Sequence, residues 1–435
     1  MTRSSTRAIL AAALLAVLSQ PSLASAQSRS DSVPVVTLDE ARQRAALVDP
    51  DAIAARSRLE AAEWQRRAAV TNLLTPNVTA GMTYTHFSEP FFNFGTGSIS
   101  PNSASATLDA RYTVLGAGKF GELRNSRASV ASAEANETVA RFRTSLETDA
   151  AYFSVLANRD LSRVVADRLK RAQEQLGIAR VRVQAGEAIA SDSLQLLLEV
   201  SRARLALLSR DSAVVASRLR LGRLIGLDGP AEAAPIDTVK PPALPMSQEE
   251  AIAEMRRRGP DVEASRAEER SASALLSSQK ERYLPEITIG ATTGRYDSEL
   301  FPSALKRSQY AVILSLPFWN GGARELAVAR ARADRDIARA TRADRERGAA
   351  EVMAQAYHGY LTSRGGIDLA LIRVAAATEN YRVQRARYRE GATTILDLLE
   401  AQVGLSEAEA ALIEARYSTR LALAQIEALL GRRIF

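Results

Sequence analysis

The sequence contains no cysteine among its 435 residues and only two histidines. Without cysteine the chain can form neither disulfides nor thiolate metal sites, and it cannot carry a lipid on an N-terminal cysteine. His86 and His358 fall in segments of different predicted structure and have no evident partners. A zinc site or a histidine-based catalytic triad is therefore not expected. We predict no catalytic residue, no metal and no cofactor, and thus a protein that is not an enzyme.

Long apolar runs are also missing, except close to the N-terminus. There, Arg3 and Arg7 precede the apolar stretch 8–18, and residues 24–26 (Ala-Ser-Ala) form a small-residue cleavage site. The stretch has about half of the roughly 20 residues that a membrane-spanning helix needs. Residues 1–26 are therefore predicted to be a secretory signal peptide. The 57 basic and 50 acidic residues are interspersed, which is typical of solvated helix faces and indicates no binding of nucleic acid.

What the sequence does contain is an internal duplication. Residues 151–226 align with residues 356–431 without a gap at an offset of 205, and Pro50 matches Pro260 at an offset of 210. A repeat of this length exceeds the periods of about 20–50 residues that are found in solenoids and propellers. It indicates a duplicated half-protein. The chain is predicted to have three parts after the signal: a first structural repeat (27–226), a proline-rich linker (227–247) and a second structural repeat (248–435).

Both repeats show the same order of predicted elements. A helix is followed by two strands with alternating apolar and polar residues, then by a long helix, a glycine turn and a last helix. The strands are predicted near 77–87, 104–115, 286–296 and 308–316. Such strands match the roughly 9–11 residues that cross a bilayer, and their two faces suit lipid and water. The long helix of about 65 residues would span on the order of 100 Å, enough to pair with the two shorter helices as a coiled-coil-like rod.

The strands also constrain the assembly. Lipid cannot satisfy open strand edges, so a sheet in a membrane must close into a barrel. Two chains would supply eight strands around an interior filled by side chains, whereas three chains would supply twelve and leave room for a lumen. Asp109 and Arg111 lie on the polar face of one strand and suit a hydrated barrel lumen. A homotrimer is therefore predicted.

One motif points elsewhere. Residues 116–121 spell G-x-G-x-x-G between a strand and a helix, which is the pattern of dinucleotide-binding sites. The preceding strand alternates instead of being apolar throughout, and the following helix is several times too long for a βαβ crossover. We interpret the glycines as a flexible exit from strand to helix.

Three features together resemble the TolC-like outer membrane efflux proteins, or outer membrane factors. They are the duplication, the segment 316–322 (LPFWNGG) before a long helix, and the tip segment 388–401 (YREGATTILDLLEA). The resemblance covers essentially the whole mature chain. It implies a mainly α fold with a membrane β part: an α-helical barrel that crosses the periplasm, and a 12-stranded trimeric β-barrel in the outer membrane of a Gram-negative-type cell, with four strands from each chain.

The same resemblance implies the function and the partners. The protein would be the passive exit duct of a tripartite efflux pump or of a type I secretion system. Its expected partners are two further copies of the chain, a periplasmic adaptor, an inner-membrane transporter of the RND, ABC or MFS type, and outer-membrane lipid. A periplasmic coiled-coil adaptor or a structural protein of the cell envelope is the alternative, which the lipid-suited strands disfavour. The sequence predicts neither the transported substrate nor the particular transporter.

A periplasmic gate is also implied by the resemblance. It would lie beside the two glycine turns at the helix tips, Gly186 and Gly391. The residues assigned to it are Asp397, Glu400, Tyr388 and Asp192. Rings of carboxylates would favour cations over anions, although acidic residues also cap the first turn of a helix. The best-known member of the family has a basic residue in the closed-state network where this chain has Thr393, so that salt bridge is not predicted here.

Overall fold

The computed structural model describes six stretches of the chain: residues 33–93, 97–116, 118–236, 241–302, 305–316 and 318–435. The predicted signal peptide (1–26) lies outside the described residues. Within the described stretches the chain is mostly helical, and no helix there is both long and apolar enough to cross a membrane. Val35–Phe435 form one compact unit.

The two repeats contain the same helices in the same order. Those of the first repeat are α2 (Leu38–Val48), α3 (Pro50–Leu74), α4 (Lys119–Gln184) and α5 (Ala190–Leu224). Those of the second repeat are α6 (Gln248–Arg258), α7 (Pro260–Glu281), α8 (Ala323–Arg389) and α9 (Ile395–Leu430). The sequence pattern did not indicate the short helices α2 and α6. Each ends where a proline follows, because the residue before proline is forced into extended backbone: ψ is 125° at Asp49 and 134° at Gly259.

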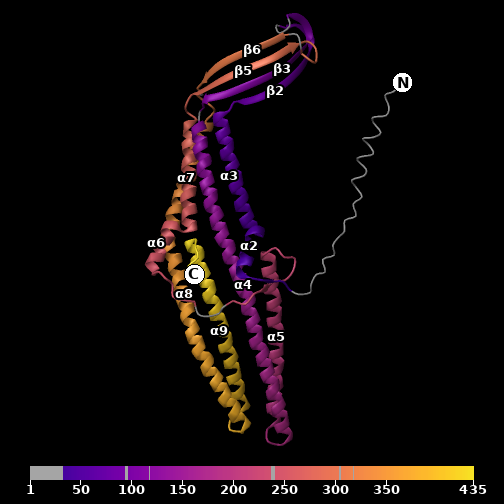
Figure 1. Cartoon of the computed structure of the whole chain (residues 1–435), viewed down its shortest axis with the longest axis vertical. Helices are drawn as coiled ribbons and strands as arrows, with labels where there is room; N and C mark the ends of the chain where they lie inside the picture. The colour runs from indigo at the N-terminus through magenta and orange to yellow at the C-terminus, as the bar shows by residue number, and fades with distance from the viewer. Residues whose placement is uncertain (1–32, 94–96, 117, 237–240, 303–304, 317) are drawn as a thin grey trace, which may run out of the picture. The chain divides into compact units, whose positions relative to one another are not determined.

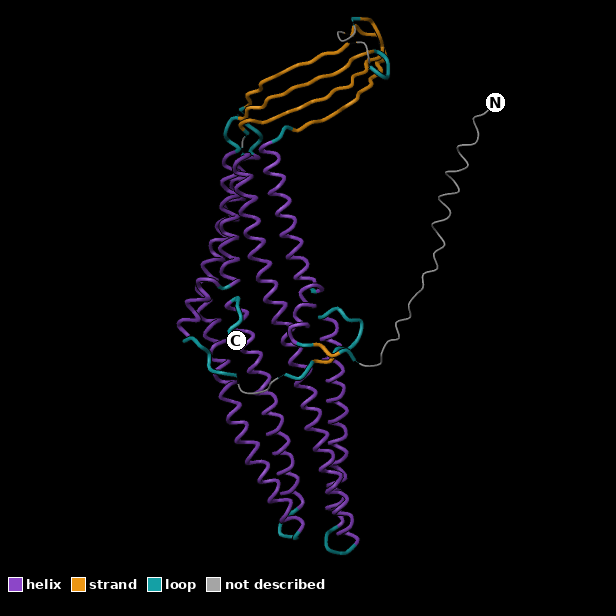
Figure 2. Tube along the Cα trace, in the orientation of Figure 1, coloured by secondary structure: helices purple, strands orange, loops and turns teal. Residues whose placement is uncertain are grey.

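The long helices form two antiparallel pairs that lie side by side. α4 packs along α5, and α8 packs along α9, with the turns of both pairs at one end (Figures 1 and 2). The pairs meet through α4 and α9. Toward the strands, α3 and α7 take the places of α5 and α9 beside the long helices. Each long helix is therefore covered along its length by two shorter ones, as expected from the predicted lengths.

A four-stranded antiparallel sheet follows the other ends of the long helices (Figure 1). Its strands are β2 (Asn77–Asn93), β3 (Ser98–Leu115), β5 (Glu286–Asp297) and β6 (Leu305–Ser315), in the order β2-β3-β5-β6. β2 and β3 extend beyond the alternating segments, because their ladder resumes at Phe91–Ser100 after a register shift that follows His86. The rings of Phe87 and Phe91 pack edge to face across this irregularity, 4.6 Å between centroids.

The register gives the sheet one apolar and one polar face. Leu108, Ala110 and Tyr112 share a face with residues of β5 and β6, since Ala110 pairs with Ala291, and Ala291 pairs with Tyr310. The opposite face carries a polar row across all four strands. The row consists of Thr79, Asp109, Thr292 and Gln309. The two-sided character predicted for single strands therefore extends across the whole sheet.

The segment between the repeats is anchored to both long helices. Its first part forms β4 (Glu232–Ala233), which pairs in parallel with β1 (Val35–Val36). The buried Tyr152 hydroxyl on α4 donates to the Ala234 carbonyl oxygen (2.8 Å), and the buried Tyr360 hydroxyl on α8 donates to the Pro242 carbonyl oxygen (2.7 Å). The proline-rich linker is thus a strap that runs between the two helix pairs, as far as its described residues show.

Two buried tyrosines of α8 make a matched test of this anchoring. Tyr360→Phe should lower the free energy of unfolding by about 0.5–1.5 kcal/mol, because it removes the hydrogen bond that holds the strap at Pro242. Tyr381→Phe should be neutral or stabilising, because the buried Tyr381 hydroxyl has no hydrogen-bond partner among the described residues. Urea titration followed by circular dichroism measures both. Equal losses would show that the strap hydrogen bond contributes nothing specific.

Candidate gate at the helix tips

The two tip turns have the same backbone structure. Gly186 after α4 and Gly391 after α8 have φ of 75° and 73°, in the left-handed region that favours glycine. The Gly186 and Gly391 amides donate to Val183 and Tyr388, three residues earlier, at 3.1 Å. Both turns therefore end their helices in the way that is common for a glycine after the C-cap. The repeats differ at the tips only through their side chains.

Asp397 lies in the first turn of α9, where it is tied to the turn. Its carboxylate accepts hydrogen bonds from the hydroxyls of Thr394 (2.6 Å) and Thr393 (2.8 Å) and from the Thr394 amide (3.0 Å). The bonds from Thr394, then that from Thr393, lower the pKa of the Asp397 carboxyl. Thr394 and Asp397 form a capping box, so the helix-capping interpretation of this acid holds. Thr393, where no basic residue stands to form a salt bridge, therefore contacts Asp397 directly.

Glu400 lies one turn further along the same face of α9. Both Asp397 and Glu400 are exposed, whereas Ile395, Leu398 and Ala401 between and beside them are buried. Residues three apart on a helix are neighbours, so the two carboxylates form one acidic patch that points away from the packed core. This geometry leaves both charges accessible to solvent and ions.

Tyr388 and Asp192 meet across the repeats, apart from this acidic patch. Tyr388 on α8 is 2% exposed, and burial together with the negative charge of Asp192 raises the pKa of its hydroxyl. No hydrogen bond of ordinary geometry joins the two groups. The Tyr388 ring belongs to an apolar core between the four tip helices. This core contains Leu176, Ala179, Leu196, Tyr381, Tyr388, Ile395, Leu398, Ala401 and Leu405.

Arg182, which the sequence analysis did not identify, joins the two tips. Its Nη1 donates to the carbonyl oxygen of Tyr388 (2.6 Å), and its guanidinium lies over the Tyr388 ring at 5.3 Å. A cation is favoured at the C-terminal end of a helix, where carbonyl groups lack partners inside the helix. Arg182 is thus the residue through which α4 holds the end of α8. A contact to a backbone carbonyl leaves no signature in a single sequence.

The two residues predicted for the barrel lumen lie on the polar face of β3. Asp109 accepts hydrogen bonds from Thr292 Oγ1 on β5 (2.6 Å) and from Thr107 Oγ1 (3.1 Å). Arg111 lies on the same face, opposite Asn77 and Gly290. Asp109 therefore ties two strands together on the polar face of the sheet.

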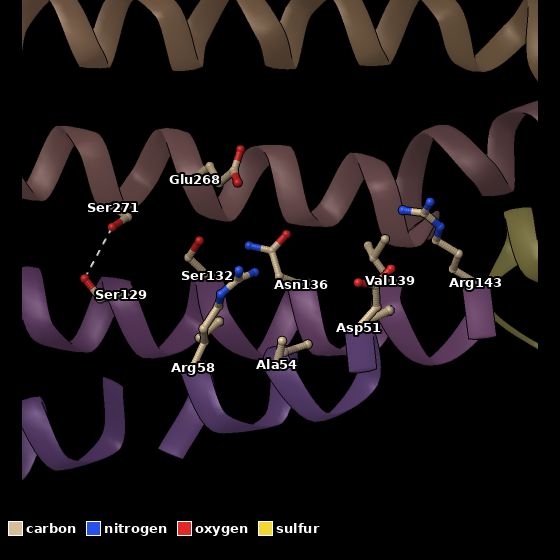
Figure 3. Close-up of a pocket in the computed structure, with 13 residues that line it drawn as sticks. Asp51, Ala54, Arg58, Ser129, Ser132, Asn136, Val139, Arg143, Glu268 and Ser271 are labelled. Carbon is tan, nitrogen blue, oxygen red and sulfur yellow. Dashed lines mark hydrogen bonds between the residues drawn. The ribbon is translucent and has the colours of Figure 1, made fainter. Parts of the chain in front are cut away.

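A groove of about 610 Å³ lies between α3, α4 and α7 (Figure 3). None of the residues that line it belongs to the tip turns. Arg58 and Ser132 face each other across it, with Glu268 on α7 above them. Arg58 and Glu268 occupy equivalent positions in the two repeats but carry opposite charges.

In the part of the chain with described positions, no group of three or more His, Asp or Glu residues is placed to hold a metal ion.

The model of one protein family, described as outer membrane efflux protein, matches residues 41–227 and 251–432, once in each repeat. The chain belongs to the outer membrane efflux protein family. It is therefore an efflux channel protein of the outer membrane. Proteins of this family are channels rather than enzymes, and they work within tripartite pumps together with an adaptor and an inner-membrane transporter. The family, location and function that were predicted from the duplication and the two segments are confirmed.

Individual relatives and solved structures agree with this assignment. The chain is 26% identical to the pyoverdine export outer membrane protein OpmQ of Pseudomonas aeruginosa over 420 residues, which cover 91% of this chain and 83% of OpmQ. It is 24% identical to the toluene efflux pump outer membrane protein TtgC of Pseudomonas putida over 62% of this chain and 56% of TtgC. The fold is similar to the Campylobacter jejuni CmeC channel (TM-score 0.79, 18% identity, 91% and 85% of the chains covered). It is also similar to the open state of the Neisseria gonorrhoeae MtrE channel (TM-score 0.75, 20% identity, 91% and 89% covered).

Proposed function

We propose that three copies of this efflux protein form a continuous exit duct, with a 12-stranded β-barrel in the outer membrane and an α-helical barrel in the periplasm. An adaptor and an inner-membrane transporter would deliver substrates to its periplasmic end, in an efflux pump or a type I secretion system. The observation that carries the proposal is the repeat itself: for a helix face and for the sheet edges, the surface equivalent to a contact between the two repeats has no partner among the described residues of one chain.

The helices supply one such surface. Ile413 on α9 packs against a buried cluster that includes Tyr152 and Leu156 of α4. Its equivalent in the first repeat, Leu208 on α5, is 62% exposed. Further exposed apolar residues lie along α5 with Leu208 at helical spacing, and together they form an apolar seam. The residues of this seam are Leu194, Leu198, Leu205, Leu208, Val215 and Leu219. Since α4 covers this face on α9, α8 of a second copy is the equivalent partner for α5.

The sheet supplies a second surface. β3 of the first repeat pairs with β5 of the second, while β6 and β2 are left as edges. In the repeat, β6 corresponds to β3 and β2 corresponds to β5, so the edges would pair between copies as β3 and β5 pair within one. A sheet with an apolar face cannot keep open edges in lipid. If each copy pairs its β6 with β2 of the next copy, three sheets close into one barrel without open edges. The polar face with Asp109 and Arg111 then lines the lumen of this barrel.

The gate belongs to the same proposal. Asp397 and Glu400 would face the axis of the duct at its periplasmic end, three carboxylates at each level. Tyr388 and Asp192, behind them, would hold the helix pairs in the closed arrangement, and the turns at Gly186 and Gly391 would form the rim. Carboxylate rings concentrate cations and disfavour anions at a constriction. This explains why the acids are exposed while their neighbours on α9 are packed.

Fractionation followed by planar-bilayer recording tests the duct. We expect the protein in the outer-membrane fraction, a native mass of three chains, and cation-preferring conductance. A protein recovered from the soluble periplasm, or a monomer without conductance, would contradict the proposal.

The ionisation of Asp397 provides a separate test of the gate. Its depressed pKa predicts that the carboxylate stays charged above its own pKa and loses its charge only as the pH falls through that value, below the usual range for aspartate. In a Glu400→Gln background, cation preference should therefore persist to lower pH than an ordinary aspartate allows. Thr394→Ala removes the principal donor and should move the loss of cation preference to higher pH, whereas Thr394→Ser should not. Identical pH profiles for the two variants would speak against Asp397 as the titrating group.

A further inference from the structure

Two polar contacts join the helix ends of the two repeats within one chain. The first is the bond from Arg182 on α4 to the Tyr388 carbonyl oxygen on α8, at 2.6 Å. The second is an ion pair between Glu174 on α4 and Arg385 on α8, at 3.7 Å. Both lie within about three turns of the tips, and both connect α4 with α8. They hold the first helix pair to the second at the periplasmic end.

When the repeats are aligned at their offset of 205, each residue of these two contacts has a chemically equivalent residue in the other repeat. Arg182 corresponds to Arg387, and Tyr388 corresponds to Val183, whose carbonyl can accept in the same way. Glu174 corresponds to Glu379, and Arg385 corresponds to Arg180. A donor, an acceptor and a pair of opposite charges are thus all present a second time, with the roles of α4 and α8 exchanged.

In one chain these second sets have no such partners. Arg387 is exposed; among the described residues it donates to the Ala392 carbonyl in its own turn, at 3.2 Å, and its charge also acts on Asp397 of the same repeat. Arg182 likewise reaches Glu187 in its own turn. Arg180 is exposed and has no ion pair among the described residues. Glu379 accepts two hydrogen bonds from Arg382, three residues along the same helix (2.7 and 2.8 Å), so it would share its carboxylate with a cation of another copy. Among the described residues, none of these three charged side chains makes a hydrogen bond or an ion pair with the other repeat.

We infer that α8 of one copy is joined to α4 of the next by these two contacts: Arg387 donates to the carbonyl of Val183 of the partner subunit, and Glu379 pairs with Arg180 of the partner subunit. The inference rests on the proposed trimer and specifies how its copies meet at the gate. It uses the residues that occupy, in the other repeat, the positions of those that make the same contacts inside one chain. A bond to the end of a helix also places the cation where the helix dipole favours it.

The contacts between copies are weaker than those within a chain. Tyr388 offers its ring to Arg182, whereas Val183 offers none to Arg387. Further from the tip, Tyr417 on α9 donates to Asp160 on α4 at 2.7 Å, and the equivalent residues are Ser212 and Gly365. Midway along the helices, the interface between copies therefore lacks this hydrogen bond and depends more on the tip contacts. When the gate opens, we expect the copies to part at this interface before the two repeats of one chain separate.

Engineered cysteine pairs test the inference, because the natural chain has no cysteine to interfere. Val183→Cys with Arg387→Cys, and Arg180→Cys with Glu379→Cys, should yield covalent dimers and trimers on denaturing gels after treatment with a short bismaleimide. The matched control, Glu174→Cys with Arg385→Cys, should cross-link within one chain and leave the apparent mass of a monomer.

The outcomes separate this inference from the proposed function. A native trimer that conducts but gives no covalent ladder with either pair would overturn the inference and leave the duct intact. A chain that forms no trimer would contradict the duct itself.

As a second measurement, Glu379→Arg or Arg180→Glu should each increase the open probability in planar bilayers, and the double exchange should restore the closed state. Failure of the double exchange to restore it would count against the ion pair.

Discussion

Replacing Arg42 by alanine is expected to lower the free energy of unfolding by about 3–5 kcal/mol. Arg42 on α2 holds Asp149 on α4 with two bonds, Nε to Oδ1 at 2.5 Å and Nη2 to Oδ2 at 2.6 Å. The Asp149 side chain is only 3% exposed. Without Arg42 a buried carboxylate would lose its partner, and breaking such a pair costs more than the pair itself contributes. The equivalent of Asp149 in the second repeat is Ala354, so α6 lacks this attachment.

Arg44→Ala on the same helix is the control. Arg44 pairs with Glu40 at 2.7 Å, but both side chains are more than 40% exposed. An exposed pair of this kind contributes about 0–1 kcal/mol. Urea titration of the detergent-solubilised protein, followed by circular dichroism of the helices, compares the two variants. Arg42→Ala combined with Asp149→Ala should be less destabilised than Arg42→Ala alone, because no buried charge remains. Similar midpoints for Arg42→Ala and Arg44→Ala would contradict this account.

The long helices and their turns could be predicted because their causes are local. Small and apolar residues at helical spacing favour α4 and α8, and Gly186 and Gly391 supply the left-handed backbone that ends them. The short helix α2 also has a local cause, namely its end before Pro50. It was overlooked because its eleven residues bury little besides Ala41 and Ala45, which gives a weak apolar pattern.

The strand ends and the tip contacts depend on partners that are distant in the sequence. Alternation stops near His86, yet β2 continues, because backbone hydrogen bonds to β3 do not depend on side-chain polarity. Arg182 donates to a carbonyl that lies 206 residues away in the sequence. Nothing in its local sequence distinguishes it from Arg180, the neighbouring arginine on the same helix. Comparison of the two repeats at the tips would have found the equivalent charges, but only the structure pairs them.

Asp397→Asn combined with Glu400→Gln should weaken block of the channel by multivalent cations about tenfold, which corresponds to ~1.4 kcal/mol. The two acids form one exposed patch at the start of α9, and a trimer would present it three times around the axis. The amides remove the charge but keep an oxygen for the hydroxyls of Thr393 and Thr394. The helix cap therefore survives in large part, and the change in block reports charge rather than unfolding of the tip.

Glu414→Gln is the matched control for this variant. Glu414 is exposed on the same face of α9 as Glu400, fourteen residues and thus about 21 Å along the helix. Its carboxylate would line the wider part of the duct, where water and salt screen it from a blocking ion. Block should therefore remain as in the natural protein. If Glu414→Gln weakened block as much as the double variant, or if the double variant blocked normally, the constriction would have to lie elsewhere than at the start of α9.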